Sequence, residues 1–257
     1  MATDHTPITL EVCVDSLTSA KTAAELGAQR IELNAALELG GLTPSIGLVE
    51  QVVTALQPLG CQTIAMVRPR PGGFAYSNDE VTTMQNDIDR LLDAGVDGVA
   101  MGVLDRQGEI EEQACQTLIK PVLDASKDAV FHRAIDLTPD AINAIDSLIS
   151  IGFTRVLTSG GRVTALEGDA TIRQMIERAA GRIVVLPGSG INASNAAQLI
   201  RETGCTQVHA SLREAVEDTS GSHNPAIQFD SPPPANLGYH QADPDKITAM
   251  RAAINQR

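Results

Sequence analysis

The chain has 257 residues, of which 43% are hydrophobic, only 2% are aromatic and none is tryptophan, and its formal net charge is −13. This length and apolar content exclude disorder and suit one α/β domain, whereas the acidic balance and the scarcity of aromatic side chains argue against nucleic acid and anionic membranes as partners. Four separated cysteines without a C-x-x-C pair, no run of about 20 apolar residues and no signal-like start predict a cytoplasmic chain with reduced thiols.

Short apolar runs alternate with helical patterns along the sequence. Eight strands are expected, at residues 8–13, 29–34, 61–68, 97–101, 129–132, 154–158, 182–186 and 206–210. Helices are expected at residues 16–27, 43–57, 79–93, 111–125, 139–150, 165–179, 194–202 and 244–254. This alternation predicts a parallel sheet. We expect a tail over residues 1–7 and a single-domain (βα)8 TIM-type barrel over residues 8–257, with a long mobile loop at residues 217–242. An open doubly wound sheet is the alternative, but it would need blunted edge strands.

An internal repeat supports the count of eight strands. Four segments share a glycine that would end a helix in the left-handed conformation, followed by an apolar residue; the glycines are Gly27, Gly95, Gly152 and Gly204. Five positions after the glycine, two segments carry Glu32 and His209, whereas the other two carry Ala100 and Leu157. Strand alternation then predicts that Glu32 and His209 lie on equivalent faces.

Polar residues gather where the predicted strands end. The strand at residues 129–132 runs directly into His132, Arg133 and Asp136, and Thr138 would cap the next helix. In a barrel such ends converge on one rim, where ligands bind. The other candidates at this rim are Glu11, Cys13, Glu32, Arg68, Arg70, Ser159, Gly188, Ser189, Gly190 and His209.

Three arginines at the predicted rim indicate an anion-binding site. Arg68, Arg70 and Arg133 would bind a carboxylate or phosphate in two-point fashion, with Glu11 and Ser159 in the same ligand-binding group. The alternative is that the arginines pair internally with rim carboxylates. A second anion site is expected at Gly188, Ser189 and Gly190, because glycines before a helix capped by Asn192 or Ser194 expose N–H groups.

Four rim residues are candidates for proton transfer. His132 and His209 would carry the proton, and Glu32 or Asp136 would orient a ring. Each histidine has the alternative of a hydrogen-bonded structural role. Cys13, the one cysteine expected at the rim, is the candidate metal ligand, since Cu(I) prefers sulfur.

Seven motifs, in order along residues 8–213, resemble the CutC family of copper homeostasis proteins. They are Glu11-Val12-Cys13, Arg30-Ile31-Glu32-Leu33, Gly40-Gly41-Leu42-Thr43-Pro44-Ser45, Arg68-Pro69-Arg70, Phe131-His132-Arg133-Ala134 with Asp136, Arg155-Val156-Leu157-Thr158-Ser159-Gly160 and Ala165-Leu166-Glu167-Gly168. The resemblance implies a TIM-type barrel, a cytosolic location, self-association as a homodimer or higher homo-oligomer, and copper handling. Asn34 stands where relatives commonly carry a second cysteine, so only Cys13 remains of the family's paired-thiol site.

Two functions follow from these observations. The first is copper homeostasis with Cu(I) binding, as the resemblance implies. The second is an enzyme that acts on a small anionic or phosphorylated metabolite by general acid/base chemistry, as the arginines, histidines and carboxylates of the rim indicate.

Overall fold

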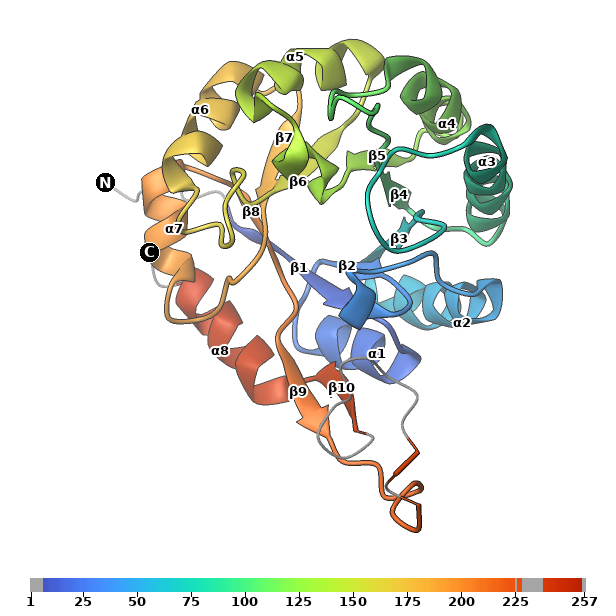
Figure 1. The fold of residues 1–257 in the computed structure, drawn as a ribbon. Coiled ribbons are helices and arrows are strands. Elements are labelled where there is room, and N and C mark those ends of the chain that lie inside the picture. Colours follow the sequence, from blue (N-terminus) through green and yellow to red (C-terminus); the bar gives the residue numbers. More distant parts are fainter. Residues whose placement is uncertain (1–6, 225, 228–237, 256–257) are drawn as a thin grey trace.

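The computed structural model describes residues 7–224, 226–227 and 238–255, and it confirms the (βα)8 barrel (Figure 1). The eight parallel strands are β1 (Thr9–Val14), β2 (Arg30–Leu33), β3 (Gln62–Met66), β4 (Gly98–Met101), β5 (Asp128–Phe131), β6 (Arg155–Thr158), β7 (Val184–Pro187) and β8 (Gln207–Ala210). They pair in the order β7-β6-β5-β4-β3-β2-β1-β8. A bridge between Gly188 and His209 connects the two outer members, so the sheet closes as the repeat predicts.

Helices surround the barrel and cover its outer face (Figure 1). They are α1 (Leu17–Glu25), α2 (Ile46–Leu56), α3 (Asn78–Asp93), α4 (Glu112–Asp124), α5 (Ala141–Ile151), α6 (Asp169–Ala179), α7 (Ala196–Thr203) and α8 (Pro244–Asn255), with short 3-10 turns η1 (Leu37–Leu39), η2 (Gln57–Leu59) and η3 (Arg133–Leu137). Within the described residues, none of these helices combines the length and apolarity needed to cross a membrane.

The repeated glycines end helices as predicted. Gly27, Gly95, Gly152 and Gly204 have φ angles of 91°, 88°, 108° and 73°, in the left-handed region that glycine adopts without a steric penalty. The residue after each is buried between helix and sheet, for example Val96 and Phe153. The sequence repeat therefore corresponds to a packing unit of the structure. In each unit a glycine ends a helix, and an even-numbered strand begins shortly after it.

Strand alternation divides the buried residues into two sets. Outward residues such as Leu10 and Val12 join the large core between sheet and helices. The barrel interior is split instead into an apolar part and a polar part. Ile64, Met66, Ala100 and Val130 form a separate apolar cluster. The polar part lies mainly along β8, β1 and β2, where Glu11, Arg30, Glu32 and His209 are buried, and Arg155 of β6 is a further buried charge.

The expected loop at residues 217–242 is shorter than predicted. Two strands, β9 (Arg213–Val216) and β10 (Tyr239–Ala242), pair antiparallel outside the barrel, so the last four residues of that segment are not loop. The backbone N–H of Ala242 donates to the Ser19 hydroxyl of α1 at 3.0 Å, which anchors this hairpin. Residues 225 and 228–237 lie outside the described residues, as does most of the expected tail.

The residues that cap α5 and α7 differ from the prediction. Asp140 rather than Thr138 caps α5, because its carboxylate accepts from two backbone N–H groups, while η3 occupies the residues just after β5. Asn195 rather than Asn192 or Ser194 precedes α7, and its side chain makes no capping bond.

Candidate functional site

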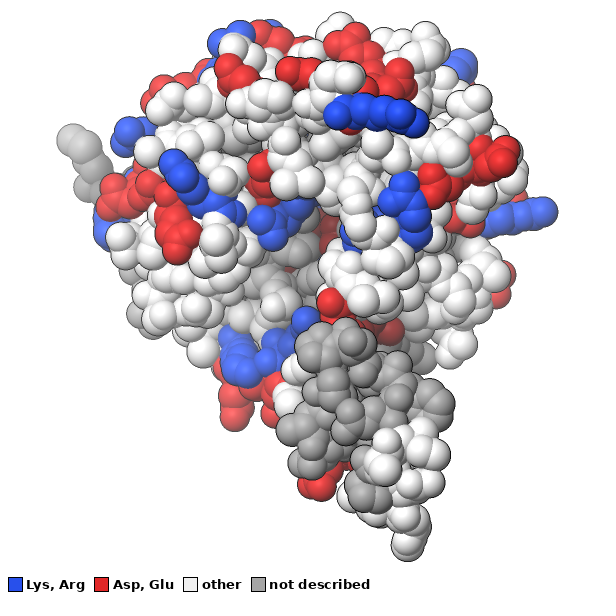
Figure 2. Space-filling model, in the orientation of Figure 1, with Lys and Arg blue, Asp and Glu red and all other residues white. Residues whose placement is uncertain are grey.

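A cavity of about 210 Å³ lies at the carboxyl end of the barrel strands. Its lining residues come from β1, β2, β3, β5, β6 and β8 or from the segments that follow them: Cys13, Glu32, Asn34, Leu37, Gly40, Met66, Arg68, Phe74, His132, Arg133, Leu157, His209, Ser211 and Arg213. On this face, basic side chains border the central hollow (Figure 2). The rim predicted from the sequence therefore exists, but only part of the predicted residue set lines it.

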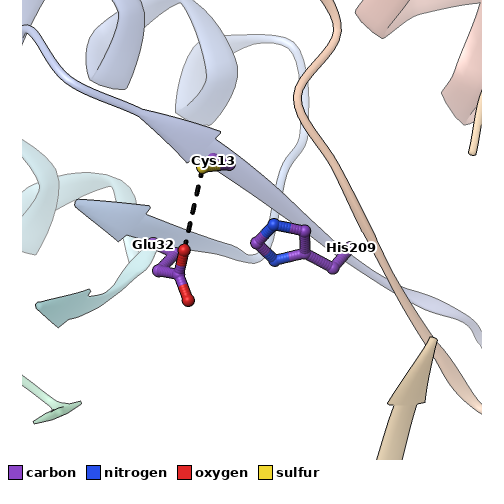
Figure 3. A group of neighbouring side chains, drawn as sticks. All are labelled: Cys13, Glu32 and His209. Carbon is purple, nitrogen blue, oxygen red and sulfur yellow. Dashed lines mark hydrogen bonds between the residues drawn. The ribbon is translucent and has the colours of Figure 1, made fainter. Parts of the chain in front are cut away.

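Cys13, Glu32 and His209 converge on one wall of the cavity, from β1, β2 and β8 (Figure 3). One ligand atom from each residue lies within 4.8 Å of the others, and all three residues are buried. The Cys13 Sγ donates to a Glu32 carboxylate oxygen at 3.7 Å. The parallel register explains the closeness, because Cys13 pairs directly with Glu32 across β1 and β2.

Glu11 and Arg30 fix the orientation of His209. Glu11 forms a buried ion pair with Arg30 and contacts Nδ1 of His209 at 2.7 Å. Although burial opposes it, Arg30 and His209 hold the pKa of Glu11 well below its usual range. An ionised carboxylate only accepts, so Nδ1 carries a proton and Nε2 is the nitrogen available as a ligand. Burial lowers the pKa of His209, but the hydrogen bond to Glu11 and the charges of Glu32 and Glu11 together outweigh it and raise that pKa.

The pKa values of the other two members of the wall are both raised. Burial, and then the nearby Glu32 carboxyl, raise the pKa of the Cys13 thiol well above its usual value. Burial also raises the pKa of Glu32. Asn34 donates to the Cys13 sulfur at 3.4 Å and to Glu32 at 3.1 Å, so its amide nitrogen supports these groups rather than acting as a ligand. A metal ion at this wall would have to displace the thiol proton.

His132 lies on the opposite side of the barrel, directly after β5. Its Nδ1 accepts from the backbone N–H of Ala134 at 3.3 Å, so the neutral ring carries its proton on Nε2. Burial, and then the charge of Arg68, lower the pKa of His132 to about 3. His132 is therefore neutral at physiological pH, and neither Glu32 nor Asp136 orients it, contrary to the predicted proton-transfer pairing.

Two of the predicted anion-binding arginines bind the protein itself. The Arg68 guanidinium lines the cavity but donates to three loop carbonyls, those of Leu39, Gly41 and Gly72, at 2.9–3.0 Å. Arg70 does not line the cavity. It pairs with Glu80 of α3, where Glu80 also completes a capping box. Arg70 is therefore paired internally, although with Glu80 rather than with one of the rim carboxylates, and Arg68 shapes the cavity wall by joining two loops.

Asp136 and Ser159 join neighbouring loops rather than line the cavity. Asp136 accepts from Thr158 Oγ1 at 2.6 Å, from the backbone of Ser159 and Gly161, and from Arg133 at 2.8 Å. Both carboxylate oxygens of Asp136 already accept hydrogen bonds from these groups, so the geometry does not support its predicted catalytic role. Arg133 lines the cavity, although it also donates to Ser159 Oγ at 2.8 Å.

The glycine-rich turn after β7 lies outside the cavity lining. Ser189 has a φ of 88° and its hydroxyl donates to the carbonyl of Val163 at 2.8 Å, which joins this turn to the preceding loop. At Gly188 a Cβ would come within 2.6 Å of Leu157, so this glycine permits close packing of β7 against the barrel interior. The carbonyl of Gly190 is used by Asn195 at 2.8 Å. These contacts explain the glycines without a phosphate.

The prediction missed four functional or supporting residues. Arg30 and Arg155 are buried inside the barrel at the same repeat offset, two positions before Glu32 and Leu157, so the repeat contained the signal for them. Phe74 lines the cavity from the loop after β3 and Arg213 lines it from the start of β9, where the barrel repeat gives no signal.

Comparison with known proteins agrees with the motifs. The CutC family model matches residues 8–214. A CutC family protein of Treponema denticola is 46% identical over 222 residues, which are 86% of this chain and 88% of the relative. The copper homeostasis protein cutC homolog of Homo sapiens is 39% identical over 218 residues, or 85% and 78% of the two chains.

A solved structure agrees as well. The CutC crystal structure from Streptococcus agalactiae has a TM-score of 0.76 and 32% identity, and the match covers 79% of this chain and 98% of that one. The family model spans most of the chain and the relatives align over most of their own lengths. The predicted resemblance is therefore confirmed, and the chain belongs to the CutC family.

Proposed function

We propose that this protein serves copper homeostasis in the cytoplasm and binds a copper ion through Cys13, Glu32 and His209. The observation that carries the proposal is the convergence of these three buried ligand atoms within 4.8 Å at the cavity wall. The names of the human and mouse relatives, copper homeostasis protein cutC homolog, support the same function.

The three side chains include ligand types that copper accepts. A thiolate and an imidazole are ligands that copper accepts, and the Met66 thioether lines the same cavity as a further soft donor. The Glu11–His209 contact matches the outer-shell arrangement that orients metal-binding histidines. Asn34 does not replace the second thiol of the family's paired-cysteine site, so Glu32 and His209 complete the site in this chain.

Metal binding at this wall must be coupled to proton release. Because the pKa of Cys13 is raised by burial, the thiol loses its proton only when the ion arrives. The affinity for copper is therefore expected to rise with pH, by about tenfold per pH unit for each proton displaced.

The enzyme hypothesis receives less support. It depended on free guanidinium groups, on the glycine turn and on carboxylates that orient the histidines. Arg70 lies outside the cavity, Arg68 is bound to carbonyl groups and Asp136 is saturated. The remaining polar groups of the cavity match metal binding better than proton transfer.

Titration with Cu(I) against a competing chelator tests the proposal. Cys13→Ala and His209→Gln should each abolish Cu(I) binding that can compete with the chelator. Glu11→Gln should lower the Cu(I) affinity by about 10–100-fold, because His209 loses the carboxylate that orients it. Cys61→Ala is the matched control, because this buried thiol does not line the cavity. Wild-type affinity in both Cys13→Ala and His209→Gln would refute the site. Sedimentation velocity would test the self-association that the resemblance implies.

A further inference from the structure

The cavity is larger than a bound ion requires. Its volume of about 210 Å³ compares with about 30 Å³ for the share of one water molecule in the liquid. Cys13, Glu32 and His209 occupy one wall, so a metal ion held there leaves most of the space unused. The residues facing that space determine what else could fit.

The opposite wall contains a buried hydrogen-bond donor without a partner. The His132 side chain is 3% exposed, and its Nε2 has no hydrogen-bond partner among the described residues. Since Nδ1 accepts from Ala134, Nε2 bears the hydrogen and acts as a donor rather than as a metal ligand. A buried donor without a partner is costly, unless a ligand or water completes it.

The His132 ring is fixed before any ligand arrives. It lies against Phe74, with ring centroids 4.8 Å apart. On its other side Gly102 leaves just enough room, because a Cβ there would come within 2.8 Å of the ring. The donor is therefore held in place by packing, which lowers the entropic cost of binding.

The charges around the donor favour an anion. Arg68, Arg133 and Arg213 all line the cavity. Arg133 also forms an ion pair with Asp136, and Arg213 forms one with Glu38 at 3.1 Å. Glu32 is the one acidic residue among the described side chains of the lining, so the arginines outnumber the carboxylates there. His132 supplies a fixed donor, whereas the guanidinium groups already make hydrogen bonds or ion pairs within the protein. This arrangement suits a carboxylate better than a phosphate dianion, which needs several free donors.

We propose that the cavity binds a small organic carboxylate, one oxygen of which accepts a hydrogen bond from Nε2 of His132. The carboxylate occupies the space between His132 and the wall formed by Cys13, Glu32 and His209. This inference goes beyond copper binding and holds for the metal-free chain, since none of the groups that recognise the carboxylate is a proposed metal ligand.

Nitrogen-15 NMR of histidine-labelled, metal-free protein tests this inference directly, with oxalate, malonate, succinate and inorganic phosphate as probes. At least one dicarboxylate should shift the Nε2–H resonance of His132 and bind with measurable affinity by calorimetry. His132→Phe should weaken that binding about tenfold or more, as expected for a lost bond to a charged acceptor. His132→Asn, which keeps an N–H donor, should recover part of it.

Two controls separate the outcomes. His223→Phe changes an exposed histidine away from the cavity and should bind the dicarboxylate like the wild type. Cys13→Ala should keep dicarboxylate binding while losing Cu(I), so failure of the copper site and failure of the carboxylate site are distinguishable. No shift of the His132 resonance with any dicarboxylate would overturn the inference, and so would a shift with phosphate alone.

Discussion

Acidification should destabilise the protein through His132. The pKa of this ring is lowered to about 3 in the folded chain, by burial first and then by Arg68, against 6.5 for an ordinary histidine. As pH falls below 6.5, His132 becomes protonated in the unfolded chain but stays neutral in the folded chain. The free energy of unfolding therefore decreases between pH 6.5 and about 3. For these two values the loss between pH 7 and 5 is about 2 kcal/mol. This is a large share of the 5–15 kcal/mol typical of a domain.

The measurement compares wild type with His132→Phe, which keeps a ring against Phe74 but does not titrate. The chain has no tryptophan, so urea unfolding is followed by far-UV circular dichroism, at pH 7, 6 and 5 in carboxylate-free buffers. The wild type should lose about 2 kcal/mol more than the variant over this range, whatever their difference at pH 7. His223→Phe should retain the wild-type loss. Equal losses in wild type and His132→Phe would show that His132 is not buried as a neutral ring.

Two further substitutions test the barrel interior. Glu11→Gln removes the charge that pairs with Arg30 in the barrel, and leaving a buried cation unpaired should cost about 3–5 kcal/mol in urea unfolding; a cost below about 1 kcal/mol would mean that the pair is solvated. Gly98→Ala would bring a Cβ within 2.4 Å of the Asp128 carbonyl and should cost about 1–3 kcal/mol. Gly47→Ala, on open helix surface, should be neutral or stabilise by up to about 1 kcal/mol, and equal Tm values for the two alanine variants would contradict this packing argument.

Local sequence patterns were sufficient for the barrel and for part of its site. Glycines that end helices, apolar residues that follow them and alternation along strands are properties of neighbouring residues. They therefore placed Glu32 and His209 on the inward face correctly, and they placed Cys13 at the cavity. The offset that Arg30 and Arg155 share with each other shows that the same pattern held more information than the prediction used.

Contacts between distant segments decided the rest. Arg70 and Asp136 follow strands just as the cavity residues do, but Glu80 holds the first and the backbone after β6 holds the second. The hairpin of β9 and β10 also pairs residues that are far apart in the sequence, such as Arg213 with Ala242. No periodicity encodes these partners, because they depend on how loops fold back on the rim.

The hydrogen-bonding states of His132 and His209 show most clearly what the sequence determined and what the tertiary structure decided. The sequence by itself determined that His132 and His209 stand at strand ends of one barrel, because the strand period and the parallel order fix that position. Only the tertiary structure gave His209 a carboxylate partner in Glu11, and gave the His132 ring a backbone N–H to accept from. Those contacts set the proton on different ring nitrogens, so that one histidine can bind a metal ion and the other can donate to an anion.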